Sequence, residues 1–161
     1  MGIRYAPAGL DTGDAEKTAA ILQQRLAELI DLSLTLKHIH WNVTGPGFKA
    51  VHEMMDEQTA TVRDMVDEIA ERISTLGGEP NGLASSVVDG RSGDEYKLGV
   101  APVMDHLEAL SQVYERVGAG HREAMEQVEA LDMVSQDILI GQTRQLEMNH
   151  WFVRAHFPES D

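Results

Sequence analysis

Five side chains in the first half of the chain have the types and the spacing expected of a metal site. Two are histidines and three are carboxylates: His40, His52, Asp56, Asp67 and Glu71. The second and third of these are four residues apart, and so are the fourth and fifth, so each pair shares one face of a helix. The two pairs are eleven residues apart, close to three turns, and lie along one stripe. Imidazole nitrogen combined with several carboxylates is a ligand set that suits iron or manganese, and also zinc.

Distance along the helix prevents one copy of the chain from completing such a site. Eleven residues at ~1.5 Å each separate the two pairs by about 16 Å, whereas metal–ligand bonds are about 2 Å long. A second copy of the helix, antiparallel about a twofold axis near residues 61–62, would bring the first pair of one chain against the second pair of the other. We therefore predict two metal sites per dimer, each shared between subunits. The alternative is that these side chains form only the solvated face of an amphipathic helix.

The element that must carry both pairs is a long helix, which we predict from Phe48 to Leu76. Its apolar residues recur at steps of three and four, as on the buried face of an amphipathic helix. Pro46-Gly47 comes just before it and Gly77-Gly78 just after it, and these are helix start and stop signals.

His40 belongs to the end of a preceding helix, which we predict from Asp14, as its cap, to about Val43. His38 is two residues away, about 200° around the helix, so the two rings cannot face the same place. We assign His40 to the metal and treat His38 as a polar neighbour.

The rest of the chain predicts an all-α, four-helix bundle. A third helix is expected from Pro102 to about Leu131 and a fourth from Ser135 to about His156. The stretch 79–100 is rich in Gly, Ser, Asn and Asp and supplies the long crossover of a ferritin-like bundle, between the second and third helices. The domain boundaries follow: a short N-terminal tail, expected to be poorly ordered, at 1–13, the bundle at 14–157, and a short acidic C-terminal tail at 158–161.

Composition narrows the class of protein further. The 161 residues fit one domain, and the absence of cysteine excludes disulfides, thiolate ligands and a cysteine nucleophile. With 27 acidic and 13 basic residues, the formal charge of −14 attracts cations and repels polyanions. The first residues lack the apolar run of a secretory signal, and no stretch approaches ~18 apolar residues. We therefore expect a cytoplasmic protein with no membrane partner.

The chain resembles the Dps family, or mini-ferritins, over nearly its whole length. Three segments carry the resemblance: KHIHWNVTGPGFKAVHEMMDEQ, DEIAERISTLGG and SQDILIGQTRQLEMNHWFVRAH. The resemblance implies a di-iron site with ligands His40, His52 and Asp56 from one subunit and Asp67 and Glu71 from its twofold mate. It also implies that Trp41, beside the site, intercepts oxidising equivalents; the alternative is that Trp41 is a simple core aromatic. A short extra helix near residues 93–98 and assembly into a hollow dodecamer are further expectations.

The activity that the resemblance implies is ferroxidation with iron storage. Fe(II) is oxidised by hydrogen peroxide, or more slowly by dioxygen, and ferric oxide collects inside the cage, which protects against oxidative damage. The competing hypothesis is a DNA-compacting protein with secondary iron chemistry. Many members of the family bind DNA through a lysine-rich terminal tail, but the first thirteen residues here contain only Arg4 as a base, and the last four, PESD, are acidic. We therefore do not expect strong DNA binding.

Two further acidic pairs have a functional and a plainer interpretation. Glu53 and Glu57 are four apart and either form a solvated face or, as the resemblance implies, face the cavity where ferric oxide nucleates. Asp132 and Asp137 flank the start of the fourth helix, where carboxylates are stabilising by themselves. In Dps-like cages acidic residues at this place line threefold pores that admit iron.

One motif points to a different iron protein. Glu147-Met148-Asn149-His150 is the E-x-x-H ligand motif of ordinary ferritins, which need two such motifs and two more glutamates in one chain. No second E-x-x-H occurs, so a conventional site inside the bundle is the weaker hypothesis. A cage whose site holds zinc is also compatible with these ligand types.

Overall fold

The computed structural model describes residues 2–157, and the predicted acidic tail at 158–161 lies outside them. Helices dominate, and the elements follow in the order α1 (Thr12–Asn42), β1 (Val43–Thr44), α2 (Phe48–Thr75), α3 (Ala84–Gly90), β2 (Ala101–Pro102), α4 (Val103–Val128) and α5 (Met133–Arg154). The prediction of an all-α, ferritin-like four-helix bundle with a short helix in the long crossover is confirmed. The predicted second helix agrees with α2 to within one residue, since Leu76 is its C-cap.

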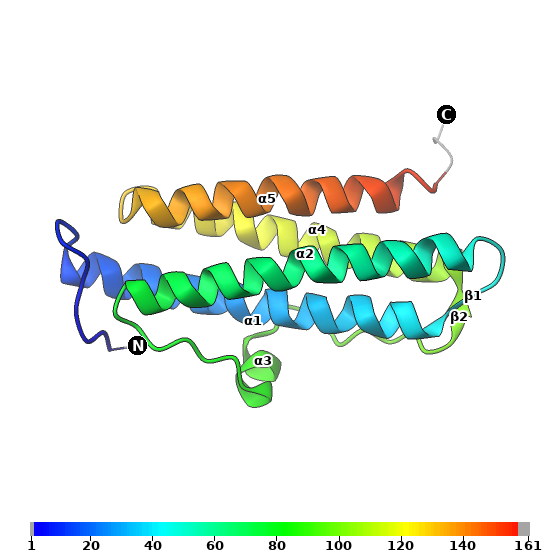
Figure 1. Ribbon diagram of the computed structural model, residues 1–161, viewed down its shortest axis with the longest axis horizontal. Helices are drawn as coiled ribbons and strands as arrows, with labels where there is room; N and C mark the ends of the chain where they lie inside the picture. The colour runs from blue at the N-terminus through cyan, green and yellow to red at the C-terminus, as the bar shows by residue number, and fades with distance from the viewer. Residues whose placement is uncertain (1, 158–161) are drawn as a thin grey trace.

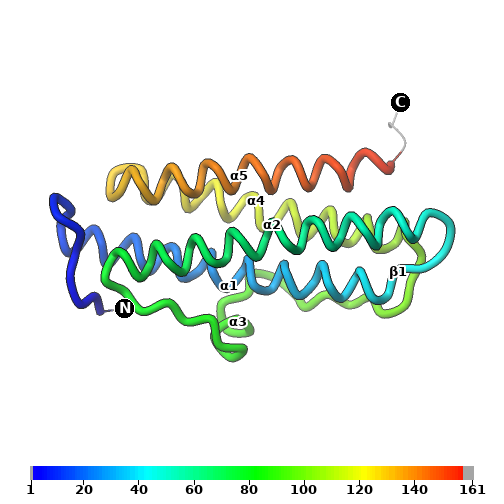
Figure 2. The backbone as a smooth tube through the Cα atoms, in the orientation of Figure 1, coloured from blue at the N-terminus to red at the C-terminus, as the bar shows by residue number. Residues whose placement is uncertain are grey.

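The four long helices form two antiparallel pairs, α1 with α2 and α4 with α5 (Figures 1 and 2). The crossover returns along the length of the bundle, so α4 runs in the same direction as α2. As a result, the end of α1, the start of α2 and the start of α4 meet at one end of the molecule. There β1 and β2 pair in parallel, with Val43 opposite Ala101 and Thr44 opposite Pro102. We call this the β1–β2 end.

Buried apolar side chains from all four long helices form the core. They include Leu22, Leu29 and Leu36 from α1, Met55 and Ile69 from α2, Leu107 and Leu110 from α4, and Leu139 and Leu146 from α5. Burying one such side chain contributes ~1.5–3 kcal/mol, and this packing rather than local propensity stabilises the long helices. Among the helices that the structure describes, none is long and apolar enough to cross a membrane.

The start of α1 differs from the prediction. Asp11 caps the helix in place of Asp14, because its carboxylate accepts the backbone N–H groups of Gly13 and Asp14 at 2.8 and 3.2 Å. The helix therefore begins at Thr12, and Asp14 lies in the first turn, where a negative charge stabilises the helix dipole.

The starts of the last two long helices also move by a few residues. Asp132, and not Ser135, caps α5, since its carboxylate accepts the backbone N–H of Ser135 at 3.1 Å. Pro102 precedes α4 as its N-cap instead of standing in its first turn. Neighbouring residues with equal capping ability cannot be ranked from local sequence, so the tertiary contacts decide between them.

The crossover helix lies earlier in the chain than predicted. Residues 93–98 contain no helix, and α3 occupies Ala84–Gly90. Packing selects this position, because α3 lies against α1 and Val87 is only 5% exposed. Gly93 has a φ of +83°, a left-handed conformation that cannot continue into a right-handed helix.

Residues 2–11 lie against the end of α2, and the poor order expected of the N-terminal tail stays a prediction. The backbone N–H of Arg4 donates to the carbonyl of Gly77 at 2.9 Å, and the hydroxyl of Tyr5 donates to the carbonyl of Ser74 at 3.1 Å. Gly77 has a φ of +85°, and a Cβ there would collide with the backbone of Tyr5. The segment is therefore packed on the end of α2.

Candidate metal centre

Two histidines from different helices interlock at the β1–β2 end. His40 is in the last turn of α1 and His52 is in the second turn of α2. Each Nδ1 lies 2.8 Å from the backbone carbonyl oxygen of the other residue, and the two rings stack with centroids 3.6 Å apart. A carbonyl oxygen only accepts, so both Nδ1 atoms must carry the proton. This leaves the lone pair on each Nε2, which is the form of histidine that binds a metal.

Asp56 lies beside this pair, one turn further along α2. Its Oδ1 is 3.4 Å from Nδ1 of His40 and 2.5 Å from Nζ of Lys37. The hydrogen bond from Lys37, aided by the two nearby histidines, holds the pKa of Asp56 below its ordinary value. The carboxylate is therefore ionised at neutral pH, as a metal ligand must be.

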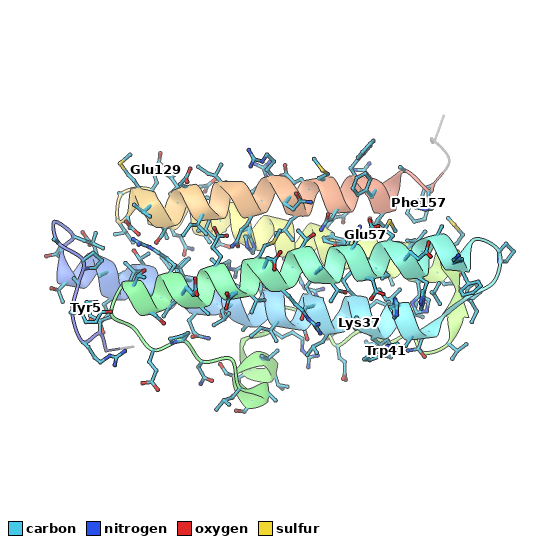
Figure 3. The ribbon with its side chains drawn as sticks, in the orientation of Figure 1. Tyr5, Lys37, Trp41, Glu57, Glu129 and Phe157 are labelled. Carbon is cyan, nitrogen blue, oxygen red and sulfur yellow. The ribbon has the colours of Figure 1, made fainter. Side chains whose placement is uncertain are left out.

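Lys37 also links the carboxylate to Trp41. Its Nζ is 5.6 Å from the centre of the Trp41 ring, a cation–π distance. Trp41 is 71% exposed, and Figure 3 shows both side chains on α1 near the β1–β2 end. Trp41 thus lies near the histidine pair without covering it.

Asp67 and Glu71 lie elsewhere on α2, where both are exposed. They line an open groove of about 520 Å³ between α2 and α5, together with Asp64, Glu68 and Arg144. The structure therefore does not bring them to the histidine pair of their own chain. Within residues 2–157, no three histidine or carboxylate side chains converge closely enough to hold a metal ion.

The predicted nucleation and pore residues have different surroundings. Glu53 and Glu57 are exposed on α2, and Glu53 is 3.6 Å from Lys49 in an exposed ion pair of little energetic weight. Asp137 is exposed on α5.

Asp132 is committed to contacts within the chain. It is only 8% exposed, and its carboxylate accepts Nη2 of Arg72 at 2.6 Å as well as the backbone N–H of Ser135. Burial raises the pKa of Asp132, but the hydrogen bonds from Ser135 and Arg72 outweigh burial, so the pKa lies below its ordinary value. The capping interpretation of Asp132 is thus confirmed, and its pore role stays a prediction.

The E-x-x-H motif does not form a ligand pair. Glu147 accepts the Nε–H of Arg122 at 2.8 Å, whereas His150 is 2.8 Å from the hydroxyl of Ser111 and stacks on Tyr114. The two side chains are thus bound to different partners on α4. This agrees with the sequence analysis, in which a conventional ferritin site inside the bundle is the weaker hypothesis.

A polar cluster inside the bundle escaped the sequence analysis. Arg25 and Glu28 of α1 are 8% and 4% exposed and form two hydrogen bonds, of 2.8 and 3.1 Å. His121 of α4 is fully buried, and its Nε2 is 3.3 Å from Oε1 of Gln142. Gly120 makes room for the pair, because a Cβ there would collide with the Arg25 guanidinium. The sequence did contain a signal for this cluster, namely the opposite charges of Arg25 and Glu28, three residues apart within the apolar stripe of α1.

Comparison with known proteins places this chain in a family. A model of the ferritin-like domain matches residues 19–159. The "DNA protection during starvation protein" of Mycolicibacterium smegmatis is 47% identical over 148 residues, which span 92% of this chain and 81% of that protein. The chain belongs to the Dps family. A solved Dps structure, DpsA14 from Streptomyces coelicolor, superposes with a TM-score of 0.96 at 46% identity and covers 99% of this chain and 95% of that one.

One relative of this Dps protein carries a different name. The "fine tangled pili major subunit" of Haemophilus ducreyi is 49% identical over 148 residues, which span 92% of this chain and 78% of that protein. Similar sequences in this family thus carry names for DNA protection and for a pilus, so the name of a relative does not decide the chemistry. The side chains at the β1–β2 end must do so.

Proposed function

We propose that this Dps protein is a ferroxidase that oxidises Fe(II), preferably with hydrogen peroxide, at di-iron sites shared between twofold-related subunits. The ferric oxide would be stored in a hollow dodecamer. The observation that carries the proposal is the interlocked His40–His52 pair, which presents two Nε2 lone pairs beside the ionised Asp56. One chain supplies only this half of a ligand set. The complementary carboxylates, Asp67 and Glu71, are exposed on the same helix, about 16 Å away.

The roles of the ligands follow from their chemistry. His40, His52 and Asp56 would bind Fe(II) from one subunit, and Asp67 and Glu71 from the second subunit would complete the coordination. Anionic oxygen ligands stabilise Fe(III) more than Fe(II), and so they lower the barrier to loss of an electron. Two Fe(II) ions supply the two electrons that convert one hydrogen peroxide to water. Hydrolysis of the two Fe(III) ions then gives ferric oxyhydroxide and releases protons.

Charge supports the transport of iron to such a site. The formal charge of −14 raises the local concentration of cations around the protein. Glu53 and Glu57 would hold Fe(III) at the inner surface for nucleation of the mineral. Asp137 is free to line a pore, whereas Asp132 would have to exchange its contact with Arg72 for one with iron.

Stopped-flow absorbance of Fe(II) oxidation by stoichiometric peroxide tests the proposal. The wild type is compared with an Asp67→Ala, Glu71→Ala double variant and with Asp64→Ala, which removes a carboxylate from the same groove. We expect fast oxidation with soluble, retained iron in the wild type and in Asp64→Ala, and a loss of at least tenfold in the double variant. Light scattering establishes that each variant assembles. Equal rates in all three proteins would mean that the stripe is only a solvated face.

Direct DNA binding is the competing function, and the name shared by several relatives is the observation in its favour. The negative charge opposes it, because affinity for DNA depends on neutralising phosphates. A gel-shift assay at low and at physiological salt separates the two functions. Retention of DNA with a steep salt dependence would support DNA compaction, and no retention at either salt would leave iron chemistry as the protective activity.

A further inference from the structure

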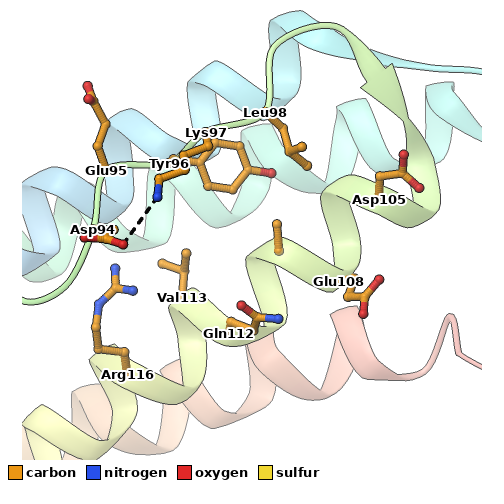
Figure 4. Close-up of a pocket in the computed structure, with 11 residues that line it drawn as sticks. Asp94, Glu95, Tyr96, Lys97, Leu98, Asp105, Glu108, Gln112, Val113 and Arg116 are labelled. Carbon is orange, nitrogen blue, oxygen red and sulfur yellow. Dashed lines mark hydrogen bonds and ion pairs between the residues drawn. The ribbon is translucent and has the colours of Figure 1, made fainter.

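A tyrosine and a histidine outside the proposed metal site form a hydrogen-bonded pair. The hydroxyl of Tyr96, in the crossover, lies 2.8 Å from Nδ1 of His106, in the first turn of α4. His106 is fully buried, and its Nε2 has no hydrogen-bond partner among the residues that the structure describes. Figure 4 shows the Tyr96 side chain extending from the crossover with its hydroxyl toward the start of α4. In the tautomer that carries its proton on Nε2, the Nδ1 atom of His106 accepts from the phenol, which is the arrangement required for proton-coupled oxidation of tyrosine.

The other tyrosines of the chain provide an internal comparison. The sequence contains 3 tyrosines, and each hydroxyl has a different acceptor. Tyr5 is exposed and donates to the backbone carbonyl of Ser74, and Tyr114 is buried and donates to Oε1 of Gln58 at 2.7 Å. Amide oxygens are too weakly basic to take up the proton that a phenol loses when it is oxidised. Tyr96 differs from both, because its hydroxyl lies 2.8 Å from a basic ring nitrogen as well as 3.5 Å from the backbone carbonyl of His106.

The pair is connected to the proposed iron site through α1. The His38 ring packs edge-on against Tyr96 with centroids 5.9 Å apart, and its Nε2 is fixed 2.7 Å from the carbonyl of Leu98. His38 precedes the ligand His40 by two residues, a rise of ~3 Å along the helix. His38 thus contacts the phenol from α1, the helix that also carries His40, although the two histidine rings face opposite sides of that helix.

We infer that Tyr96 and His106 form a redox pair, which supplies one electron when a site that holds a single Fe(II) reacts with hydrogen peroxide. This inference rests on the proposed ferroxidase function. A single Fe(II) delivers only one of the two electrons that peroxide requires, and a one-electron oxidant equivalent to the hydroxyl radical is left. The Tyr96–His106 pair reduces that oxidant before it leaves the protein.

The electrons and protons of this step balance. The O–H bond of Tyr96 breaks, its electron passes to the oxidant, and its proton moves along the hydrogen bond to Nδ1 of His106. The oxidant takes up a proton from the solvent and becomes water. A second Fe(II) later returns an electron to the phenoxyl radical, and His106 returns the proton to the oxygen. The sum is two Fe(II) oxidised per peroxide, as at a site that holds two irons.

The surroundings of His106 suit a group that is protonated only briefly. Burial lowers the pKa of His106, so the resting imidazole is neutral and able to accept a proton. The backbone carbonyls of Asn42 and Gly99 act in the opposite direction and raise the pKa. Their dipoles favour the imidazolium that forms when the phenol is oxidised, although neither carbonyl makes a hydrogen bond to Nε2.

The first experiment is performed on the iron-free protein, so its result does not depend on ferroxidase activity. Azide radicals made by pulse radiolysis oxidise exposed tryptophans such as Trp41, and the tryptophanyl and tyrosyl absorptions are followed with time. In the wild type, we expect the tryptophanyl signal to decay as a long-lived tyrosyl signal rises. Tyr96→Phe should lose most of that tyrosyl signal, and Tyr114→Phe should retain it. Equal tyrosyl yields in the wild type and in Tyr96→Phe would overturn the inference.

The second experiment adds iron. Protein with one Fe(II) per site is mixed with peroxide, frozen within milliseconds, and examined by electron paramagnetic resonance. We expect a tyrosyl radical in the wild type and in Tyr114→Phe, and at least a fivefold loss in Tyr96→Phe and in His106→Gln, which keeps the phenol but removes the base. Fast iron oxidation with no radical at Tyr96 would refute the redox pair and leave the ferroxidase intact. Slow iron oxidation with a positive result in the iron-free experiment would refute the ferroxidase alone. Circular dichroism confirms that each variant is folded.

Discussion

Two clusters that combine histidine with charged side chains stand out within residues 2–157, and they differ in whether their polar groups all have partners within the chain. Inside the bundle, Arg25 and Glu28 neutralise each other, and His121 has its own polar partner, so the cluster needs nothing from outside the chain. At the β1–β2 end, the backbone carbonyls occupy both Nδ1 atoms of His40 and His52, and both Nε2 lone pairs are left for a ligand.

The difference shows how one fold separates stability from function. A charge buried in a core must be paired within the chain, because leaving it without a partner costs several kcal/mol. A charge at an exposed site is solvated by water when it has no protein partner. The carboxylate of Asp56 can therefore be available to a metal ion with little loss of folding stability. The interior of this bundle thus contains a salt bridge, whereas the carboxylate ligands of the proposed iron site, Asp56, Asp67 and Glu71, are exposed.

The largest effect on stability is expected from breaking the interior pair on one side. Glu28→Ala leaves the guanidinium of Arg25 buried without its carboxylate, and we expect the free energy of unfolding to fall by about 3–5 kcal/mol. Urea unfolding at fixed protein concentration measures the change. The double variant Arg25→Met, Glu28→Leu serves as the control and should recover most of the loss. A loss of free energy of unfolding no larger than that of a surface substitution would mean that Arg25 does not depend on Glu28 for its charge neutralisation.

The next effect is a dependence of stability on pH. Burial, aided by the charge of Arg25, lowers the pKa of His121 to about 4, whereas a histidine in the unfolded chain titrates near about 6.5. The unfolded state therefore binds a proton in the window between these values, and the folded state does not. The contribution of neutral His121 to the free energy of unfolding is fully present above about pH 6.5. It falls as the pH drops toward 4, by up to about 1.4 kcal/mol per pH unit. His121→Gln should flatten this part of the urea–pH profile, and an unchanged slope would exclude His121 as its cause.

A smaller effect is expected at the start of α5, where the carboxylate of Asp132 is shared between capping and the ion pair with Arg72. Asp132→Ala should destabilise the protein by about 1–2 kcal/mol, through loss of the cap and of the ion pair. The contribution should also vanish in acid, because the pKa of Asp132 lies below its ordinary value and its ionised form is needed. Asp137→Ala, which removes an exposed carboxylate from the same helix, should change thermal stability little.

The smallest effect on stability, and the sharpest contrast with the interior, is expected at Asp56. Asp56→Asn removes an exposed ion pair with Lys37 and weakens a 3.4 Å contact with His40, so the urea midpoint of the iron-free protein should not move measurably. Fe(II) oxidation by peroxide should nevertheless slow by at least tenfold, because the amide replaces an anionic ligand. If Asp56→Asn lowers the urea midpoint but leaves the rate of Fe(II) oxidation unchanged, Asp56 is a structural residue and not an iron ligand.

The fold followed closely from periodicity, and most errors fell where local signals compete. The apolar steps of three and four placed α2 to within one residue. In contrast, α1 and α5 each had two residues able to cap them, and α3 had a composition no more helical than its surroundings. Val87 packs against α1, and that contact is with an element more than forty residues away.

The sequence by itself determined the four long helices and the stripe that carries Asp56, Asp67 and Glu71. It also determined the separation along that stripe, which prevents one chain from completing the site. These conclusions need only the geometry of a single helix. The tertiary structure decided that His40 and His52 interlock, that Glu147 and His150 have different partners, and that Tyr96 meets His106. The physical reason is that a contact between two elements depends on how they cross and how far one is shifted along the other. No local pattern records that shift, because the packing of the whole bundle sets it.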